Sequence, residues 1–215
     1  MRKVTFGGAN SLDNYIARKD DAVDWLMWSD EVTELMNDFW AKIDCIVMGR
    51  KTYDVAMKMS PPAAPTTSSA DHPADEASAP LLKPGGESNP ATPPQAGGEP
   101  KLANPYGDMK TYVFSRTLEP GERNGVEIVA EDAGKFVRKL KKQKGKEICV
   151  MGGGELGRSL LEAGVIDEIG FNIQPVLLGS GIPLFHEMTR QIDLELIECK
   201  PLKTGCVYIL YRVKN

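Results

Sequence analysis

Residues 148–158 read Ile148-Cys149-Val150-Met151-Gly152-Gly153-Gly154-Glu155-Leu156-Gly157-Arg158. The apolar run at the start is typical of a central strand that helices cover on both faces. Three glycines then lead into a segment that favours a helix. Glycine lets backbone N–H groups close around a phosphate, and the positive helix end favours the anion. The stretch therefore predicts a strand–turn–helix unit that binds a pyrophosphate, with structural glycines in a tight turn as the alternative interpretation.

The glycines also meet the G-x-G-x-x-G spacing of the Rossmann fingerprint. That fingerprint usually opens the first strand–helix unit and needs an acid at the end of the next strand. Here the glycines come late in the chain, and the next strand ends in Gln174-Pro175. The sequence therefore favours phosphate binding at this turn without a Rossmann fold.

Two earlier strand ends carry similar signals. Val47-Met48-Gly49-Arg50-Lys51-Thr52-Tyr53 offers a glycine that lets a ligand approach the backbone, followed by cations and a hydroxyl at a helix start. Tyr112-Val113-Phe114-Ser115-Arg116-Thr117 ends a strand in hydroxyls and a guanidinium. Guanidinium groups suit a phosphate monoester. Each signal has an ordinary surface turn as its alternative, but together they point to one ligand and favour NADPH over NADH.

The pattern along the chain alternates apolar strands with amphipathic helices. The predicted strands are Lys3–Gly8, Asp44–Met48, Thr111–Ser115, Val126–Val129, Glu147–Met151, Glu168–Val176, Asp193–Cys199 and Cys206–Val213. The predicted helices are Ser29–Lys42, Lys51–Lys58, Asp132–Gln143 and Glu155–Ala163. This order predicts an α/β fold with three layers, αβα. Its sheet would be mostly parallel, with about eight strands and an antiparallel C-terminal hairpin across Pro201–Gly205.

One segment, from Ser60 to Pro105, differs from the rest. It holds 11 of the 15 prolines and no Val, Ile, Phe or Trp. Such a composition cannot bury enough apolar surface to offset the entropy of ordering. We expect a disordered insertion at about 60–105 that interrupts a single domain spanning 1–215 and does not join two domains.

Bulk properties exclude several classes of protein. The net charge of −4 is mild, which argues against nucleic acid as a partner. No apolar run is long enough for a membrane span, and the N-terminus has no long apolar segment of a secretory signal. We therefore expect a cytoplasmic protein. The four cysteines form no C-x-x-C pair, and Cys45, Cys149 and Cys206 lie in strand-like runs, so buried thiols are expected.

Taken in order, these motifs resemble the dihydrofolate-reductase-like superfamily. The resemblance covers the chain outside the insertion and includes Ser11-Leu12-Asp13-Asn14-Tyr15-Ile16-Ala17, the segments already quoted, and Pro175-Val176-Leu177-Leu178-Gly179-Ser180-Gly181-Ile182-Pro183-Leu184-Phe185. The first and last of these resemble the reductase domain of bacterial riboflavin-biosynthesis enzymes, the RibD C-terminal domain family, as a stand-alone member. Relatives of this kind imply a homodimer.

The resemblance implies NADPH as cofactor and a small-molecule substrate. Cofactor binding would fall to Ala9, Ile16, Gly49, Arg50, Lys51, Thr52, Ser115, Arg116, Gly152, Gly153, Gly154 and Glu155. Substrate binding would fall to Asn10, Ser11 and Trp25. Asp13 and Glu34 are the candidate catalytic residues, which would orient or protonate the substrate; the alternative for each is a capping or surface acid, and for Glu34 a solvated helix face is favoured. No metal site is expected, since the His-x-Glu and Pro-Cys-x-x-Cys of the zinc deaminases are missing.

Two positions depart from the family pattern. Asn14 stands where the family has glycine, and asparagine tolerates positive φ better than most residues. The acid that assists dihydrofolate reduction would fall near Thr33, between Glu31 and Glu34, which counts against folate.

The predicted function is therefore an NADPH-dependent reductase that resembles 5-amino-6-(5-phosphoribosylamino)uracil reductase of riboflavin biosynthesis. The alternatives are a dihydrofolate or other carbonyl or heterocycle reductase on the same scaffold, a non-catalytic nucleotide-binding protein, and a scaffold whose insertion recruits partners.

Overall fold

The computed structural model describes residues 1–59, 104 and 106–214. The insertion predicted at about 60–105 therefore lies outside the described residues, apart from Asn104.

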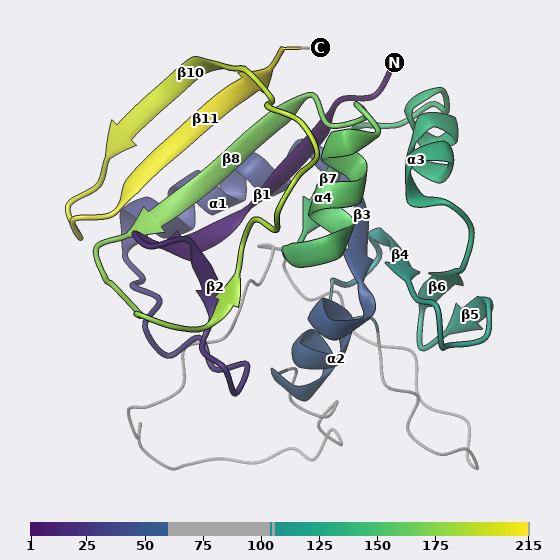
Figure 1. Ribbon diagram of the computed structural model, residues 1–215, viewed down its shortest axis with the longest axis horizontal. Coiled ribbons are helices and arrows are strands. Elements are labelled where there is room, and N and C mark those ends of the chain that lie inside the picture. The colour runs from purple at the N-terminus through teal and green to yellow at the C-terminus, as the bar shows by residue number, and fades with distance from the viewer. Residues whose placement is uncertain (60–103, 105, 215) are drawn as a thin grey trace, which may run out of the picture.

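A nine-stranded sheet forms the centre of the molecule (Figure 1), in the order β10-β11-β8-β1-β7-β3-β4-β6-β5. The parallel strands are β1 (Val4–Ser11), β3 (Ile43–Gly49), β4 (Lys110–Phe114), β6 (Val126–Val129), β7 (Glu147–Met151) and β8 (Glu168–Gln174). The antiparallel strands are β5 (Gly121–Arg123), β10 (Leu194–Pro201) and β11 (Val207–Val213). Two short strands, β2 (Tyr15–Ala17) and β9 (Ile182–Pro183), pair separately.

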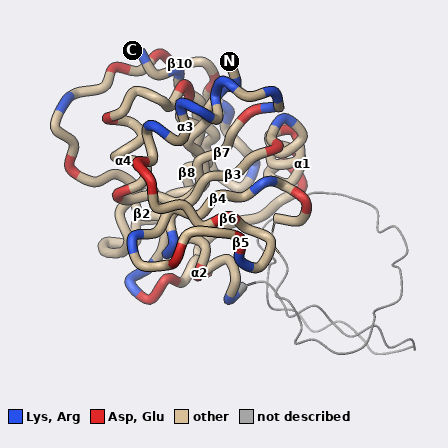
Figure 2. The backbone as a smooth tube through the Cα atoms, turned by 90° about the vertical axis from the view of Figure 1, so that its right-hand side faces the viewer, with Lys and Arg blue, Asp and Glu red and all other residues tan. Residues whose placement is uncertain are grey.

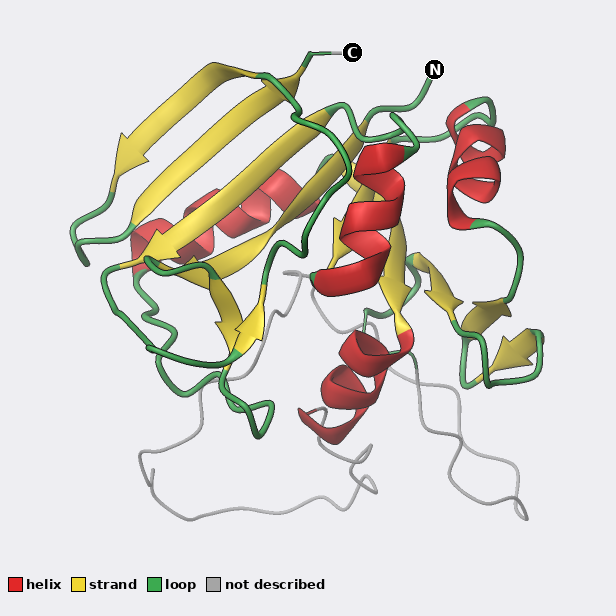
Figure 3. Cartoon of the chain, viewed as in Figure 1, coloured by secondary structure: helices red, strands yellow, loops and turns green. Residues whose placement is uncertain are grey.

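Helices cover both faces of this sheet, which confirms the three-layer prediction (Figure 3). The core on one face includes side chains of α1 (Asp30–Trp40) and α2 (Arg50–Met59). The core on the other includes α3 (Ala133–Lys141) and α4 (Gly154–Glu162). Successive residues of β3 alternate between the two cores, which is why its sequence is apolar throughout.

The start of α1 shows how local sequence sets a helix boundary. The Ser29 hydroxyl accepts a hydrogen bond from the Val32 backbone N–H at 3.2 Å, as a helix cap does. Val32 and Trp40 are buried, and the apolar residues between them are half-buried, so the predicted apolar face is confirmed.

All eight predicted strands and all four predicted helices are present, and the C-terminal hairpin is confirmed. Three short strands, β2, β5 and β9, were not predicted. β5 is exposed along its whole length, so its sequence lacks the alternation of apolar and polar residues by which a strand is predicted. β1 also runs past its predicted end at Gly8, because its pairing with β8 continues as far as Ser11 and Gln174.

The predicted burial of three cysteines is confirmed. Cys45, Cys149 and Cys206 are buried free thiols, whereas Cys199 is exposed. Burial raises the pKa of the Cys45 thiol to about 11, so it stays protonated and packs as a small apolar group.

In the part of the chain that the structure describes, no helix is long and apolar enough to cross a membrane. Basic and acidic residues are interspersed over the fold (Figure 2).

Candidate functional site

The predicted phosphate-binding turns meet at one edge of the sheet. Because β3, β4 and β7 are parallel neighbours, their carboxyl ends lie side by side. Met48 is level with Met151, and Gly49 is level with Phe114. The turns that follow these strands are therefore adjacent. One ligand could contact all three turns only in such an arrangement, which the prediction of a single ligand assumed.

The turn between β3 and α2 is open at its glycine. A Cβ added to Gly49 would have no atom within 4 Å, so the space beside its backbone is free of protein. The next residue, Arg50, donates from Nη1 to the Thr117 hydroxyl at 2.8 Å and pairs through Nε with Asp54 at 3.2 Å. Half of the Arg50 side chain remains exposed at 46%. Lys51 is exposed beside it.

The turn after β4 contains the predicted residue Ser115 and a second hydroxyl, that of Thr117, which was not among the predicted site residues. The Ser115 Oγ accepts from the backbone N–H groups of Thr117 and Leu118, at 3.1 and 2.9 Å, so it holds its own turn together. Thr117 is the hydroxyl that contacts Arg50. The sequence signal for Thr117 was its place in the Ser-Arg-Thr motif, but its partner lies on a distant segment.

The glycine turn after β7 packs closely against neighbouring elements. Gly152 has φ +86°, and a Cβ there would lie 2.2 Å from the Thr52 hydroxyl oxygen. A Cβ on Gly153 would lie 3.0 Å from Ile16 Cδ1 and from the Leu184 carbonyl oxygen. Gly152 and Gly153 are therefore needed for close packing of this turn, as the alternative interpretation of structural glycines proposed. This packing neither supports nor opposes a bound phosphate.

The start of α4 still offers N–H groups. Its cap residue, Gly153, makes no side-chain cap hydrogen bond, and the Gly154 N–H donates to the Leu184 carbonyl at 3.2 Å. The remaining N–H groups of the first turn and the helix dipole favour an anion. Glu155 in that turn pairs with Arg116 at 3.7 Å, and both side chains are largely exposed. Such a pair contributes little stability, but it links the turn after β4 to the turn after β7.

The middle of the sheet is accessible at β1. Gly8 is exposed and Ala9 is half-buried, although the residues before and after them are buried. β1 is the fourth of the nine strands and therefore lies near the centre of the sheet. Along β1, solvent reaches the sheet only at Gly8 and Ala9. Ile16 is half-buried and in contact range of Gly153. Of the two residues predicted to bind the cofactor here, Ile16 therefore lies close to the glycine turn. Ala9 lies on the neighbouring strand β1, two residues beyond Gly7, which is level with Met151 at the end of β7.

Asp13 fastens two loops together. Its carboxylate accepts from the Ser11 hydroxyl at 2.6 Å and from the backbone N–H groups of Leu178 and Gly179, at 3.1 and 2.7 Å. The Ser11 hydroxyl, followed by these backbone donors, lowers the pKa of Asp13. The carboxylate therefore stays ionised near neutral pH and is a poor proton donor. Asn14 next to it has φ +64°, so the asparagine does replace the family glycine in the left-handed conformation.

The remaining predicted residues occupy different environments. Asn10 is buried and donates to the Ser11 carbonyl at 2.8 Å, while its Oδ1 has no partner among the described residues. Trp25 is buried, and its indole N–H also has no partner there. Glu34 is exposed on α1, which matches the solvated helix face that was its alternative interpretation.

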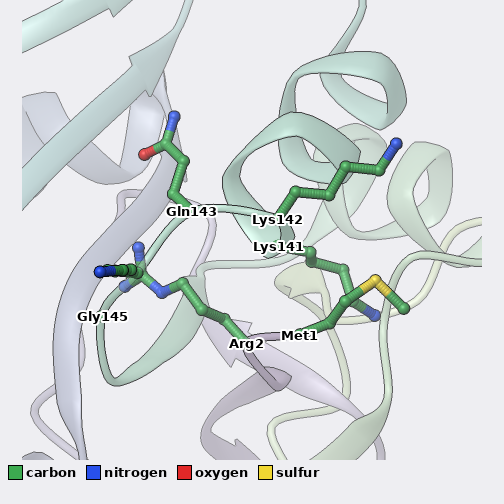
Figure 4. Close-up of a pocket in the computed structure, with 7 residues that line it drawn as sticks. Met1, Arg2, Lys141, Lys142, Gln143 and Gly145 are labelled. Carbon is green, nitrogen blue, oxygen red and sulfur yellow. The ribbon is translucent and has the colours of Figure 1, made fainter.

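A separate hollow of about 420 Å³ lies at the opposite end of the sheet (Figure 4). It is lined by Met1, Arg2, Lys141, Lys142, Gln143, Lys144 and Gly145. Two of the cations that line it already form ion pairs within the fold, Arg2 with Asp44 and Lys141 with Asp167. Ligands of open α/β sheets bind at the carboxyl ends of strands, so the candidate functional site is at the carboxyl ends of β3, β4 and β7 and not in this hollow.

The chain has a dihydrofolate-reductase-like fold, with a mostly parallel sheet between two helical layers. The pattern of the RibD C-terminal domain family matches residues 2–208, and the chain belongs to that family. These findings confirm the resemblance drawn from the sequence.

The chain is similar to two uncharacterized proteins of Bacillus subtilis (strain 168). It is 30% identical to YwjB over 196 residues, which are 91% of this chain and 89% of YwjB. It is 28% identical to YyaP over 211 residues, which are 98% of this chain and 95% of YyaP.

Solved structures show the same fold at low sequence identity. A putative riboflavin biosynthesis protein from Shewanella sp. PV-4 matches with a TM-score of 0.67 and 22% identity, and each chain is covered completely. Dihydrofolate reductase from Enterococcus faecalis, complexed with NADP(H), matches with a TM-score of 0.59 and 13% identity, over 99% of this chain and 97% of that one.

Proposed function

We propose that this protein is an NADPH-dependent reductase that transfers hydride to a small heterocycle of the ribosylaminopyrimidine type. The observation that carries the proposal is that contacts join all three predicted phosphate-binding turns. Arg50 contacts Thr117, Thr52 packs against Gly152, and Arg116 pairs with Glu155. The NADP(H) complex of the E. faecalis reductase, which has the same fold, supports a nicotinamide cofactor.

The residues present fit such a cofactor. The Arg50 guanidinium and the Thr117 hydroxyl would bind the 2′-phosphate, because a planar fork of donors suits a phosphate monoester. The first turn of α4, with no side-chain cap, would bind the pyrophosphate. Ala9 and Ile16 would lie against the nicotinamide at the accessible part of β1.

NADPH, when bound, supplies the hydride. The chain would hold the reacting carbon of the substrate close to the ring and exclude water, and this positioning supplies much of the rate acceleration. Asp13 acts here as a positioning residue, since its carboxylate fixes the turn after β1 against the loop that contains Leu178 and Gly179. Asn10, Ser11 and Trp25 would border the substrate.

A non-catalytic nucleotide-binding protein is the second candidate. One observation favours it: of the two candidate acids, Asp13 is held ionised by its neighbours and Glu34 is exposed. Steady consumption of NADPH with a ribosylaminopyrimidine would exclude it.

The cofactor assignment is tested by titrating the protein with NADPH and with NADH, followed by the fluorescence of the reduced nicotinamide. Arg50→Ala should weaken NADPH binding about 10- to 100-fold, as expected for loss of a charge-assisted contact, and should leave NADH binding nearly unchanged. Arg212→Ala is the matched control, because Arg212 is an exposed arginine paired with Glu195 on the C-terminal hairpin. Failure of the wild type to bind either nucleotide would contradict the proposal.

A further inference from the structure

A buried amide lies on the face of the sheet that α1 covers. Asn172 of β8 is only 5% exposed. Its Oδ1 atom is fully buried and has no hydrogen-bond partner among the described residues. Buried polar atoms nearly always have partners, and a buried carbonyl oxygen without a donor destabilises the fold. An amide kept at such a position indicates a partner outside the chain.

The position of Asn172 points to the substrate. In the sheet it lies level with Ala9 of β1 and Tyr208 of β11. Ile169 and Phe171 of the same strand belong to the core under α3 and α4. Strand residues alternate between faces, so Asn172 points to the α1 side together with Ala9. Because Ala9 is half-buried and expected against the nicotinamide, Asn172 lies beside the place where hydride transfer would occur.

The polar neighbours of Asn172 are neutral or already engaged. Burial raises the pKa of Tyr208 to about 12, so its phenol is uncharged at ordinary pH. Gln174, the next residue of β8 on this face, accepts through Oε1 from the Met27 N–H at 2.9 Å and from the Cys206 thiol at 3.2 Å. The amide of Asn172 is thus the polar group on this stretch of β8 whose oxygen has no donor among the described residues.

The helix above this face brings no charge to it. Val32 and Met36 of α1 pack with Cys206 in one apolar cluster. Of the four acids of α1, Glu31 accepts from the Lys203 N–H at 2.7 Å, and Asp30, Glu34 and Asp38 are exposed. A protonated heterocycle would need a carboxylate at this face, whereas a neutral heterocycle needs only neutral donors and acceptors.

We propose that Asn172 determines the substrate specificity of the enzyme by binding the edge of a neutral heterocycle that carries a ring N–H next to a carbonyl, as in a pyrimidinedione. The carbonyl of the Asn172 amide accepts from the ring N–H, and its NH₂ group donates to the ring carbonyl. This inference rests on the proposed function, because it uses Ala9 as the residue against the nicotinamide.

The first test compares two ligands on the wild-type protein saturated with NADPH. One is a 6-ribosylaminouracil, and the other is the same compound methylated on the ring N–H between its two carbonyls. The unmethylated ligand should bind about 10- to 100-fold more tightly, because methylation leaves the buried acceptor unpaired. Equal binding of the two ligands, or no binding of either, overturns the inference.

The second test changes the amide itself. Asn172→Leu has a similar volume and should abolish the preference between the two ligands and raise KM more than it lowers kcat. Asn172→Asp should weaken uracil binding and improve the relative binding of a 2,4-diaminopyrimidine, which a carboxylate selects in its protonated form. Asn37→Leu on the exposed surface of α1 is the control, and it should change neither the preference between the two ligands nor KM.

Thermal unfolding separates this role from a structural one. If Asn172 serves the substrate, Asn172→Leu should keep or raise the Tm of the ligand-free protein, because it removes an unpaired buried amide. A lower Tm together with an unchanged ligand preference would overturn the inference. In that case intact NADPH binding would still support the proposed reductase function. Failure of the wild type to bind NADPH would instead contradict both the reductase function and the role of Asn172.

Discussion

Asp13 is the residue whose charge links two loops of the site, and this link depends on pH. Because its pKa in the folded protein lies below the usual value of 3.8, the ionised form stabilises the fold. That contribution is fully present above the unfolded pKa and is lost as the pH falls through the folded pKa. Asp13→Asn should therefore lower the stability to urea at pH 7, and the difference from the wild type should shrink below about pH 3.8. A difference that stays constant with pH would show that the charge of Asp13 has no such role.

The same substitution should lower the stability at one glycine of the candidate site and leave it nearly unchanged at another. Gly152→Ala should destabilise the protein by about 1–3 kcal/mol, because φ is positive there and the new methyl group would collide with Thr52. Gly49→Ala should keep the stability within about 0.5 kcal/mol, since nothing lies within 4 Å of its Cβ position. It should still weaken NADPH binding about tenfold by filling the space beside the backbone. Urea denaturation and NADPH titration of both variants test this, and unchanged NADPH affinity in Gly49→Ala would contradict a ligand at that turn.

At the scale of elements, the approach of α4 to the sheet depends on Gly157. A Cβ there would lie 2.7 Å from Cζ of Phe6 on β1. The Phe6 ring cannot move freely, because it is fully buried and packs edge-on against Phe171 with centroids 5.2 Å apart. Gly157→Ala should therefore destabilise the fold by about 1–3 kcal/mol, although alanine is the better helix former.

The double variant Gly157→Ala/Phe6→Leu identifies the cause. If the collision with the ring is responsible, the two substitutions should couple favourably by more than about 0.5 kcal/mol in chemical denaturation. Strict additivity would show that α4 does not press on Phe6.

At the scale of the whole molecule, one edge of the sheet remains uncovered. Every residue of β10 is exposed, including the apolar Leu194, Leu196 and Ile197. β10 is the outermost strand of the sheet (Figure 1). Exposed edge strands with apolar side chains pair readily with another strand. We propose that two copies of the chain form a homodimer through β10.

Leu196→Lys should then shift the protein from dimer to monomer in sedimentation equilibrium, because a buried lysine at the pairing edge is unfavourable. Glu122→Gln on β5, the opposite edge strand, changes the net charge by the same amount and should leave the dimer intact. A wild-type protein that is monomeric at micromolar concentration would contradict the proposal.

The sequence by itself determined the alternation of strands and helices, the antiparallel hairpin and the glycine- and cation-bearing turns at the strand ends, which are predicted to bind phosphate. These follow from short-range signals: apolar runs such as Cys45-Ile46-Val47-Met48, the Ser29 cap, and glycines at strand ends. The signals act over a few neighbouring residues, so reading the chain in order recovers them. Asn14 is a further case, since its tolerance of positive φ is a property of the single residue.

Only the tertiary structure decided which of these residues meet. The contact of Arg50 with Thr117, the packing of Thr52 on Gly152 and the hydrogen bonds from Leu178 and Gly179 to Asp13 all join segments far apart in the chain. That the Asn172 oxygen has no partner among the described residues also follows only from the packing around it. The short strands β2, β5 and β9 also depend on their partners. Composition and periodicity describe how a segment folds locally, whereas hydrogen-bond partners and buried polar atoms depend on which surfaces the whole sheet brings together.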